Sequence, residues 1–247
     1  MSVEVPKQDM HVHSTFSDGN NTIEENIEEA ESLGLRQLTC VDHVRVDTDY
    51  LPDYVAAIER LRPTTSVELF CGIEAKLLNT AGDLDLPPEL PEGIDRIYAA
   101  DHQVPLADGP HHPREVKAAI EDGSMSPEEV IGAIIESTAG ACEKHDDLVI
   151  AHMFSILPKI GLDEDAVPEE ALAGLAATAA RTGNRIEISE RWSCPNARSL
   201  RPFVEAGVEG IDVARQAAFA PQVIEGIFVG REDTALIPGE ARSDAGE

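Results

Sequence analysis

The sequence predicts an α/β protein built as a single parallel β/α barrel. Seven strand-like runs occur between residues 8 and 213, and most of them are followed by a helix-like segment. This is the pattern of parallel strands joined by helical crossovers. No linker or internal repeat divides the 247 residues. A doubly wound open sheet is the structural alternative, but the Gly-rich phosphate loops GxGxxG and GxxxxGK that would favour it are absent.

The elements follow from hydrophobic periodicity and from helix-start signals. The expected strands cover residues 8–13, 36–44, 67–76, 96–100, 148–151, 185–188 and 210–213. The expected helices cover residues 22–33, 52–61, 114–120, 126–144, 168–181 and 197–206. Two helix starts are strong: Thr22 with Glu25 has the spacing of a capping box, and Ser126 precedes Pro127 in a first turn.

The composition is that of a globular protein with an unusually acidic surface. The net charge is -28, and only five lysines occur. Such a surface suits a salt-rich cytosol in which counter-ions screen self-repulsion, although an acidic protein from an ordinary cytosol has the same composition. The charge would also repel nucleic acid, and the sequence contains no basic run to offset it.

The cysteines and the amino-terminal sequence indicate the cellular compartment of the protein. None of the four cysteines belongs to a CxxC pair, so we expect reduced, buried thiols. No signal peptide is visible, and no apolar run approaches the ~18 residues that a membrane span needs. We therefore expect a cytoplasmic protein that does not associate with membranes. One domain should cover residues 1–230, followed by a loose acidic tail over residues 231–247.

The stretch DMHVHSTFSDG, from Asp9 to Gly19, is the first candidate for a functional site. His11 and His13 are two positions apart on an expected strand, so their side chains share a face and can point at one metal ion. The segment Ser17-Asp18-Gly19 has the composition of a turn. Two histidines at this spacing are a weak signal alone, so the interpretation depends on ligands from other strands.

Histidines and carboxylates stand at the ends of most other expected strands. They are Asp42, His43, Glu74, His102, His152 and Asp212. Active sites of β/α barrels are built at these carboxyl ends, and ionisable side chains are seldom buried there without partners. A mixed set of histidine and carboxylate ligands favours Zn, Mn or Fe over Ca or Mg. Two ions about 3.5–4 Å apart could clamp the attacking and leaving oxygens of a phosphoryl transfer.

Six motifs distributed from Asp9 to about Ala217 make the match more specific. They are DMHVHSTFSDG, CVDHV, GIEAK, YAADH, AHMF and GIDVA. With them the chain resembles the PHP (polymerase and histidinol phosphatase) family of metal-dependent phosphoesterases. The resemblance implies a distorted seven-stranded β/α barrel, similar to a TIM barrel, that holds two or three divalent ions.

The resemblance also implies a ligand set. One ion would be held by His11, His13, Glu74 and Asp212. A second ion, bridged by the same glutamate, would be held by Glu74, His102 and His152. A third would involve Asp18 and His43.

The last motif departs from the family pattern. It usually reads Asp-x-His, and its histidine joins the third ion, whereas Asp212 is followed here by Val213, Ala214 and Arg215. A third ion would therefore have to bind without that histidine. Arg215 is instead a candidate phosphate contact, as are Lys159 and Arg191. The expected catalytic residues are Asp212, His43 and Arg215. Asp42, which precedes His43, is expected to orient a metal ligand from behind.

The predicted function is hydrolysis of a phosphate ester by a metal-activated water. The resemblance allows histidinol phosphate, another small phosphorylated molecule such as a nucleotide, or a short oligonucleotide as substrate. One alternative is a non-catalytic barrel that serves as a scaffold or RNA-binding subunit, similar to the PHP-like subunit of archaeal ribonuclease P. Another is hydrolysis of a C–N bond. The sequence indicates no oligomeric state.

Overall fold

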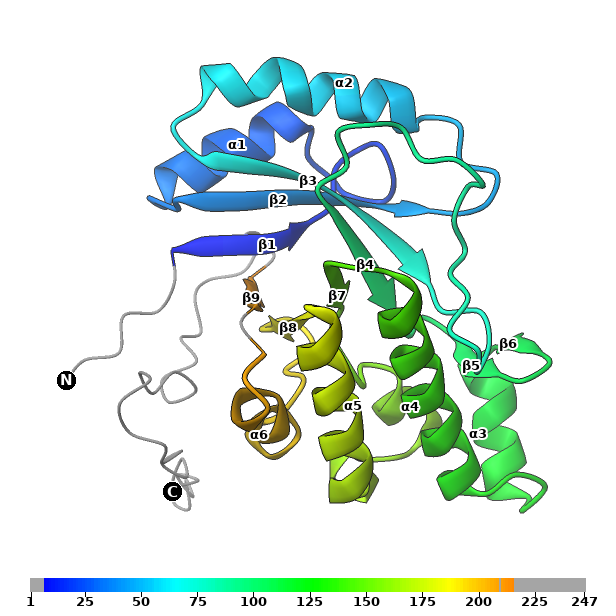
Figure 1. The fold of residues 1–247 in the computed structure, drawn as a ribbon. Coiled ribbons are helices and arrows are strands. Elements are labelled where there is room, and N and C mark those ends of the chain that lie inside the picture. The colour runs from blue at the N-terminus through cyan, green and yellow to red at the C-terminus, as the bar shows by residue number, and fades with distance from the viewer. Residues whose placement is uncertain (1–6, 209, 216–247) are drawn as a thin grey trace, which may run out of the picture.

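The computed structural model describes residues 7–208 and 210–215. Seven parallel strands form one sheet in the order β1-β2-β3-β4-β7-β8-β9. They are β1 (Gln8–Val12), β2 (Gln37–Val44), β3 (Glu68–Lys76), β4 (Arg96–Ala100), β7 (Leu148–Ile150), β8 (Arg185–Ser189) and β9 (Ile211–Ala214). The sheet curls until β9 packs beside β1, and the Arg215 N–H donates to Asp9 Oδ1 at 2.9 Å. The result is a nearly closed β/α barrel (Figure 1).

The helices cover the outside of this barrel in two groups. They are α1 (Ile23–Ser32), α2 (Leu51–Leu61), α3 (Pro113–Glu121), α4 (Pro127–Lys144), α5 (Glu169–Thr182) and α6 (Ala197–Glu205). Figure 1 shows α1 and α2 over β1, β2 and β3, whereas α4, α5 and α6 lie against the other half. Each group seals its own apolar core. The first contains Ile23, Tyr54 and Ile58, and the second contains Ile134, Leu172 and Phe203.

The predicted fold class and all seven strands are confirmed, with bounds that differ by two residues or fewer. Both predicted helix starts are also confirmed as complete capping boxes, one at Thr22 and the other at Ser126. A short hairpin of β5 (Val104–Leu106) and β6 (Gly109–His111) was not predicted. Each of its strands has only three residues, and one of them is a proline. Such a sequence cannot be distinguished from that of a loop. The expected tail at residues 231–247 and the domain boundary at 230 lie outside the described residues.

All four cysteines are free and buried. Burial raises the pKa of the Cys71 and Cys142 thiols to about 12, and it raises the pKa of Cys40 and Cys194 as well. We expect a disulfide-type thiol reagent to react very slowly with the native protein at pH 8, because reaction needs an accessible thiolate. All four thiols should react at once in guanidinium chloride. A thiol that reacts within seconds under native conditions would contradict this placement.

Within the described part of the chain, no helix is both long enough and apolar enough to cross a bilayer.

Candidate metal centre

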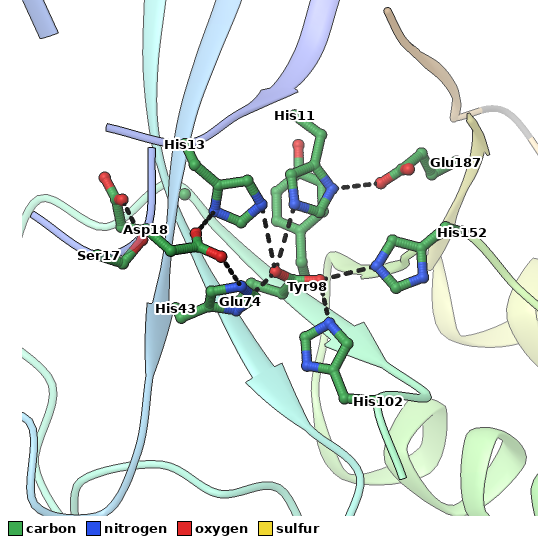
Figure 2. Close-up of polar contacts among 12 residues, drawn as sticks. His11, His13, Ser17, Asp18, His43, Glu74, Tyr98, His102, His152 and Glu187 are labelled. Carbon is green, nitrogen blue, oxygen red and sulfur yellow. Dashed lines mark hydrogen bonds and ion pairs between the residues drawn. The ribbon is translucent and has the colours of Figure 1, made fainter. Parts of the chain in front are cut away.

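Glu74 lies at the centre of a ring of histidines at the carboxyl ends of the strands (Figure 2). Its side chain is 1% exposed. One oxygen, Oε1, lies 2.9 Å from His152 Nε2 and 3.1 Å from His102 Nε2. The other, Oε2, lies 2.9 Å from His43 Nδ1, 3.4 Å from His11 Nε2 and 3.6 Å from His13 Nε2. One buried carboxylate therefore faces five imidazoles from four different segments of the chain.

The two histidines of the first strand point to this carboxylate because the strand is irregular where they lie. The pairing of β1 with β2 shifts register between Asp9 and Val12, and such a bulge re-aims the side chains beside it. His11 is fully buried, and its Nδ1 lies 2.7 Å from Glu187 Oε2. That contact fixes the ring so that Nε2 faces Glu74. A carboxylate behind a histidine in this way is typical of metal ligands.

His152 has the same kind of support from behind. Its Nδ1 lies 3.1 Å from Ser155 Oγ and 3.6 Å from Asp101 Oδ1, and the Ser155 hydroxyl donates to the same Asp101 oxygen at 2.8 Å. Its backbone has a φ of 27°, which L-residues adopt only under strain. The surrounding loop maintains this strain, since Cys194 Sγ donates to the His152 carbonyl at 3.2 Å. The ring is thereby held with Nε2 toward Glu74.

The turn after β1 brings in Asp18. The Asp42 carboxylate accepts hydrogen bonds from Ser14 N–H at 2.9 Å, Ser14 Oγ at 2.6 Å and Ser17 Oγ at 2.5 Å. Gly19 allows the turn to fold back closely, because a Cβ there would lie 2.4 Å from the His13 carbonyl oxygen. Asp18 then lies 3.5 Å from His13 Nδ1 and 3.5 Å from His43 Nε2.

The electrostatics of the cluster favour positive charge at its centre. Burial opposes protonation of His11, yet Glu187 and Glu74 raise its pKa well above the usual value. Burial also opposes ionisation of Glu74, but the His11 and His102 rings hold its pKa well below the usual range. Burial and the neighbouring His11 lower the pKa of His13 to about 3. Against burial, Asp101 and Glu74 raise the pKa of His152 to about 10, and Glu74 also raises the pKa of His43. Metal ions bind neutral imidazoles, so an ion that binds here would displace protons from these rings.

Several ligand atoms are buried without a hydrogen bond within the described structure. They are His11 Nε2, His13 Nδ1 and Glu74 Oε2. Three groups have atoms close enough to share an ion: His11, His13 and Glu74; His43, Glu74 and His102; and His13, Asp18 and His43. Buried polar atoms are normally satisfied, so orphaned atoms on residues of these groups fit divalent ions. The mixed nitrogen and oxygen donors suit Zn, Mn or Fe.

A cavity of about 740 Å³ opens over the cluster. Its lining includes Asn20, Asn21, Asn26 and Glu29 from the turn after β1 and from α1, and Lys159, Arg191 and Trp192 from the second half of the chain. The candidate ligands His43, Glu74, His102 and His152 line the cavity as well. The lysine and arginine are notable in a chain with 47 acidic residues, because they supply positive charge beside the candidate metal ligands.

A family model of the PHP domain matches residues 9–150, which is more than half of the chain. The chain belongs to the PHP domain family.

Curated relatives of this PHP protein are named probable phosphatases. One from Vibrio campbellii is 26% identical over 125 residues, which cover 48% of this chain and 50% of the relative. One from Clostridium acetobutylicum is 30% identical over 108 residues, covering 41% of this chain and 43% of the relative. The chain thus spans half or less of the length of these relatives. The structure of a histidinol phosphate phosphatase from Lactococcus lactis, complexed with zinc, L-histidinol and phosphate, has a TM-score of 0.62 at 16% identity, covering 85% of this chain and 86% of the other. This likeness supports the fold.

The structure brings together seven of the eight ligands that the PHP pattern predicts. They are His11, His13, Asp18, His43, Glu74, His102 and His152. It does not bring in Asp212. Arg185 donates to both oxygens of Asp212, at 2.6 and 3.0 Å, and Arg96 donates to one of them at 3.2 Å. These arginines come two residues before Glu187 and Tyr98 on their strands, so Asp212 turns toward the amino-terminal end of the barrel. In this structure Asp212 thus pairs with two arginines and does not belong to the candidate ligand groups, so its predicted role as a metal ligand or catalytic residue stays a prediction.

The structure also changes the roles of two other residues. Asp42 is expected from the sequence to orient a metal ligand, but its carboxylate accepts hydrogen bonds from Ser14 and Ser17 and so holds the turn after β1. Arg215 is a predicted phosphate contact, but it is not among the residues that line the cavity. Its charge lies near Glu190, where it partly offsets the rise in the pKa of that carboxyl caused by burial. The sequence reading missed Glu187 behind His11 and Asp101 behind His152. Alternation in the strand Arg185-Ile186-Glu187-Ile188 could have indicated that Glu187 points into the barrel.

Proposed function

We propose that this PHP protein is a metal-dependent phosphoesterase that acts on a small phosphorylated molecule. The observation that carries the proposal is Glu74, a buried carboxylate surrounded by five histidines, with ligand atoms that have no hydrogen bond among the described residues. The probable phosphatases among the relatives support the same reaction class.

Two divalent ions are proposed, with a third at the more exposed group of His13, Asp18 and His43. His11, His13 and Glu74 would hold one ion, and Glu74 with His43, His102 and His152 would hold the second. The third group shares His13 and His43 with these two, and a neutral imidazole has one lone pair, so a third ion would bind through Asp18 and whichever of the two rings the other ions leave available. Asp18 is 68% exposed, so this ion should exchange fastest. Bound ions would activate a water and neutralise charge on the phosphoryl oxygens.

The chain's own residues orient the reaction. Glu187 and Asp101 with Ser155 hold the rings of His11 and His152 in place, and the Asp42 turn holds Asp18 over the ligands. Lys159 and Arg191 place positive charge at the cavity wall, where a phosphoryl group would lie beside the metal ligands. The cavity lining also offers the amides of Asn20, Asn21 and Asn26 and the Glu29 carboxylate to the remainder of the substrate, which suits a leaving group with hydroxyl or amino groups.

The test is a panel of phosphomonoesters, phosphodiesters and amides assayed with added Mn²⁺ or Zn²⁺ at high salt. We expect hydrolysis of phosphomonoesters, its loss after chelation, and its return when metal is restored. Metal analysis of the purified protein should find about two tightly bound ions. Unchanged phosphatase activity in metal-depleted protein would contradict the proposal. RNA binding by a protein that holds no metal would support the non-catalytic alternative instead.

A further inference from the structure

Trp192 lies at the cavity wall between two cations and the metal ligands. Lys159 Nζ lies 4.6 Å from the centre of its ring, and the Arg191 guanidinium carbon lies 5.3 Å from it. On the inner side, the His152 ring centre is 6.3 Å away. The indole is 41% exposed, so its position is not explained by burial in the core.

The loop that carries Trp192 is held firmly. Ser189 and Cys194 pair across it, with the Ser189 N–H donating to the Cys194 carbonyl at 2.8 Å and the Cys194 N–H returning the bond at 3.3 Å. Ser193 has a φ of 52°, which closes the turn. The same loop is attached to the His152 carbonyl through Cys194. Trp192 is therefore kept at a set place relative to the metal ligands.

The backbone of Lys159 is anchored in a short helix, and its ammonium lies over the Trp192 ring. This is the 3-10 helix Leu157–Ile160, whose Leu157 and Ile160 are buried. Within the described residues, no carboxylate lies within ion-pair distance of Lys159 Nζ, although acidic residues outnumber basic ones by 47 to 19 in this chain. An aromatic face attracts a cation through its quadrupole without cancelling the charge. A carboxylate in the same place would cancel it.

We propose that Trp192 is a positioning residue that presents Lys159 as a clamp for a phosphate group bound at the metal ligands. The indole holds the Lys159 ammonium at the cavity wall by cation–π contact and leaves its charge available to an anion. The inference deepens the proposed function, on which the identity of the anion rests. Trp192 would thus act through Lys159, without contacting Glu74 or the reacting atoms of the substrate.

The test measures binding of inorganic phosphate to the Mn²⁺-loaded protein by calorimetry. Trp192→Leu and Lys159→Met should each weaken phosphate binding about tenfold, and Trp192→Phe, which keeps an aromatic face, only about threefold. The double variant Trp192→Leu/Lys159→Met should weaken binding by less than the product of the single effects, because the two residues act together. Lys144→Met is the matched control. Its ammonium pairs with Asp83 on an exposed surface, and phosphate binding should not change.

A spectroscopic signature adds a second readout. Trp192 is the only tryptophan in the chain, and Lys159 Nζ lies 4.6 Å from its ring centre. Phosphate that binds to Lys159 should therefore change the indole emission, and the change should saturate as the phosphate concentration rises. The change should be absent or much smaller in Lys159→Met and unaltered in Lys144→Met.

The possible failures are distinguishable. If the metal-loaded wild type binds phosphate with these variant effects but hydrolyses no ester, the proposed function fails and the clamp stands. If the wild type hydrolyses phosphate esters but the folded Trp192→Leu variant binds phosphate as tightly as the wild type, the clamp is overturned and the proposed function stands. Additive single effects would likewise overturn it.

Discussion

Replacing Glu74 with glutamine should reduce phosphoesterase activity by about a thousandfold or more and release most of the bound metal. Glutamine has the same shape, but its neutral amide removes the negative charge that five histidines now surround. Each of the two main ligand groups would lose its carboxylate, since Glu74 belongs to both. The measurement is metal content after gel filtration, together with kcat/KM at saturating Mn²⁺.

The control for this variant lies on the same strand. Glu68→Gln makes the same substitution at the exposed start of β3, where the carboxylate accepts from Gln37 Nε2 at 2.8 Å. Metal content and kcat/KM should remain within about twofold of the wild type, as is usual for exposed substitutions. A folded Glu74→Gln protein that kept its metal and its activity would show that the ligands lie elsewhere.

The sequence predicted the fold well because its signals are local. The strands are short apolar runs, and the capping boxes at Thr22 and Ser126 lie within four residues of chain. The order of the strands then follows from the rule that parallel strands joined by helices are neighbours. The hairpin β5–β6 and the loop that carries Trp192 have no comparable signal, because tertiary contacts and turn geometry determine their conformations.

The structure groups all of the predicted ligands except Asp212, and the reason is physical. Residues that end a strand reach the mouth of the barrel, and His43, Glu74 and His102 do so. The direction of a side chain also depends on the groups that it meets across the barrel, which the sequence does not reveal. Asp212 pairs in register with Glu187, yet Glu187 reaches His11 while Asp212 turns to Arg185. Two carboxylates at equal height thus differ in role because Arg185 on β8 and Arg96 on β4 pair with Asp212.

This placement of Asp212 predicts that Asp212→Asn destabilises the fold and leaves metal bound. The substitution leaves Arg96, whose side chain is 13% exposed, and Arg185, which is 31% exposed, without their shared carboxylate. Leaving charges of a buried ion cluster unpaired costs about 3 kcal/mol, at the low end of the range because Arg185 is partly solvated. For a chain of this size the Tm should fall by roughly 6–12 °C. Thermal unfolding by circular dichroism measures the shift.

Metal content separates this role from that of a ligand. The folded Asp212→Asn protein should bind the same number of ions as the wild type, because both oxygens of Asp212 are already engaged by Arg185 and Arg96. Adding Arg185→Gln to Asp212→Asn should recover part of the lost stability, since the unpaired cation is then removed as well. Asp83→Asn breaks only an exposed pair with Lys144 and should leave the Tm unchanged. Loss of one ion from Asp212→Asn with an unshifted Tm would instead restore Asp212 to the ligand set, and would require the carboxylate to leave its arginines when metal binds.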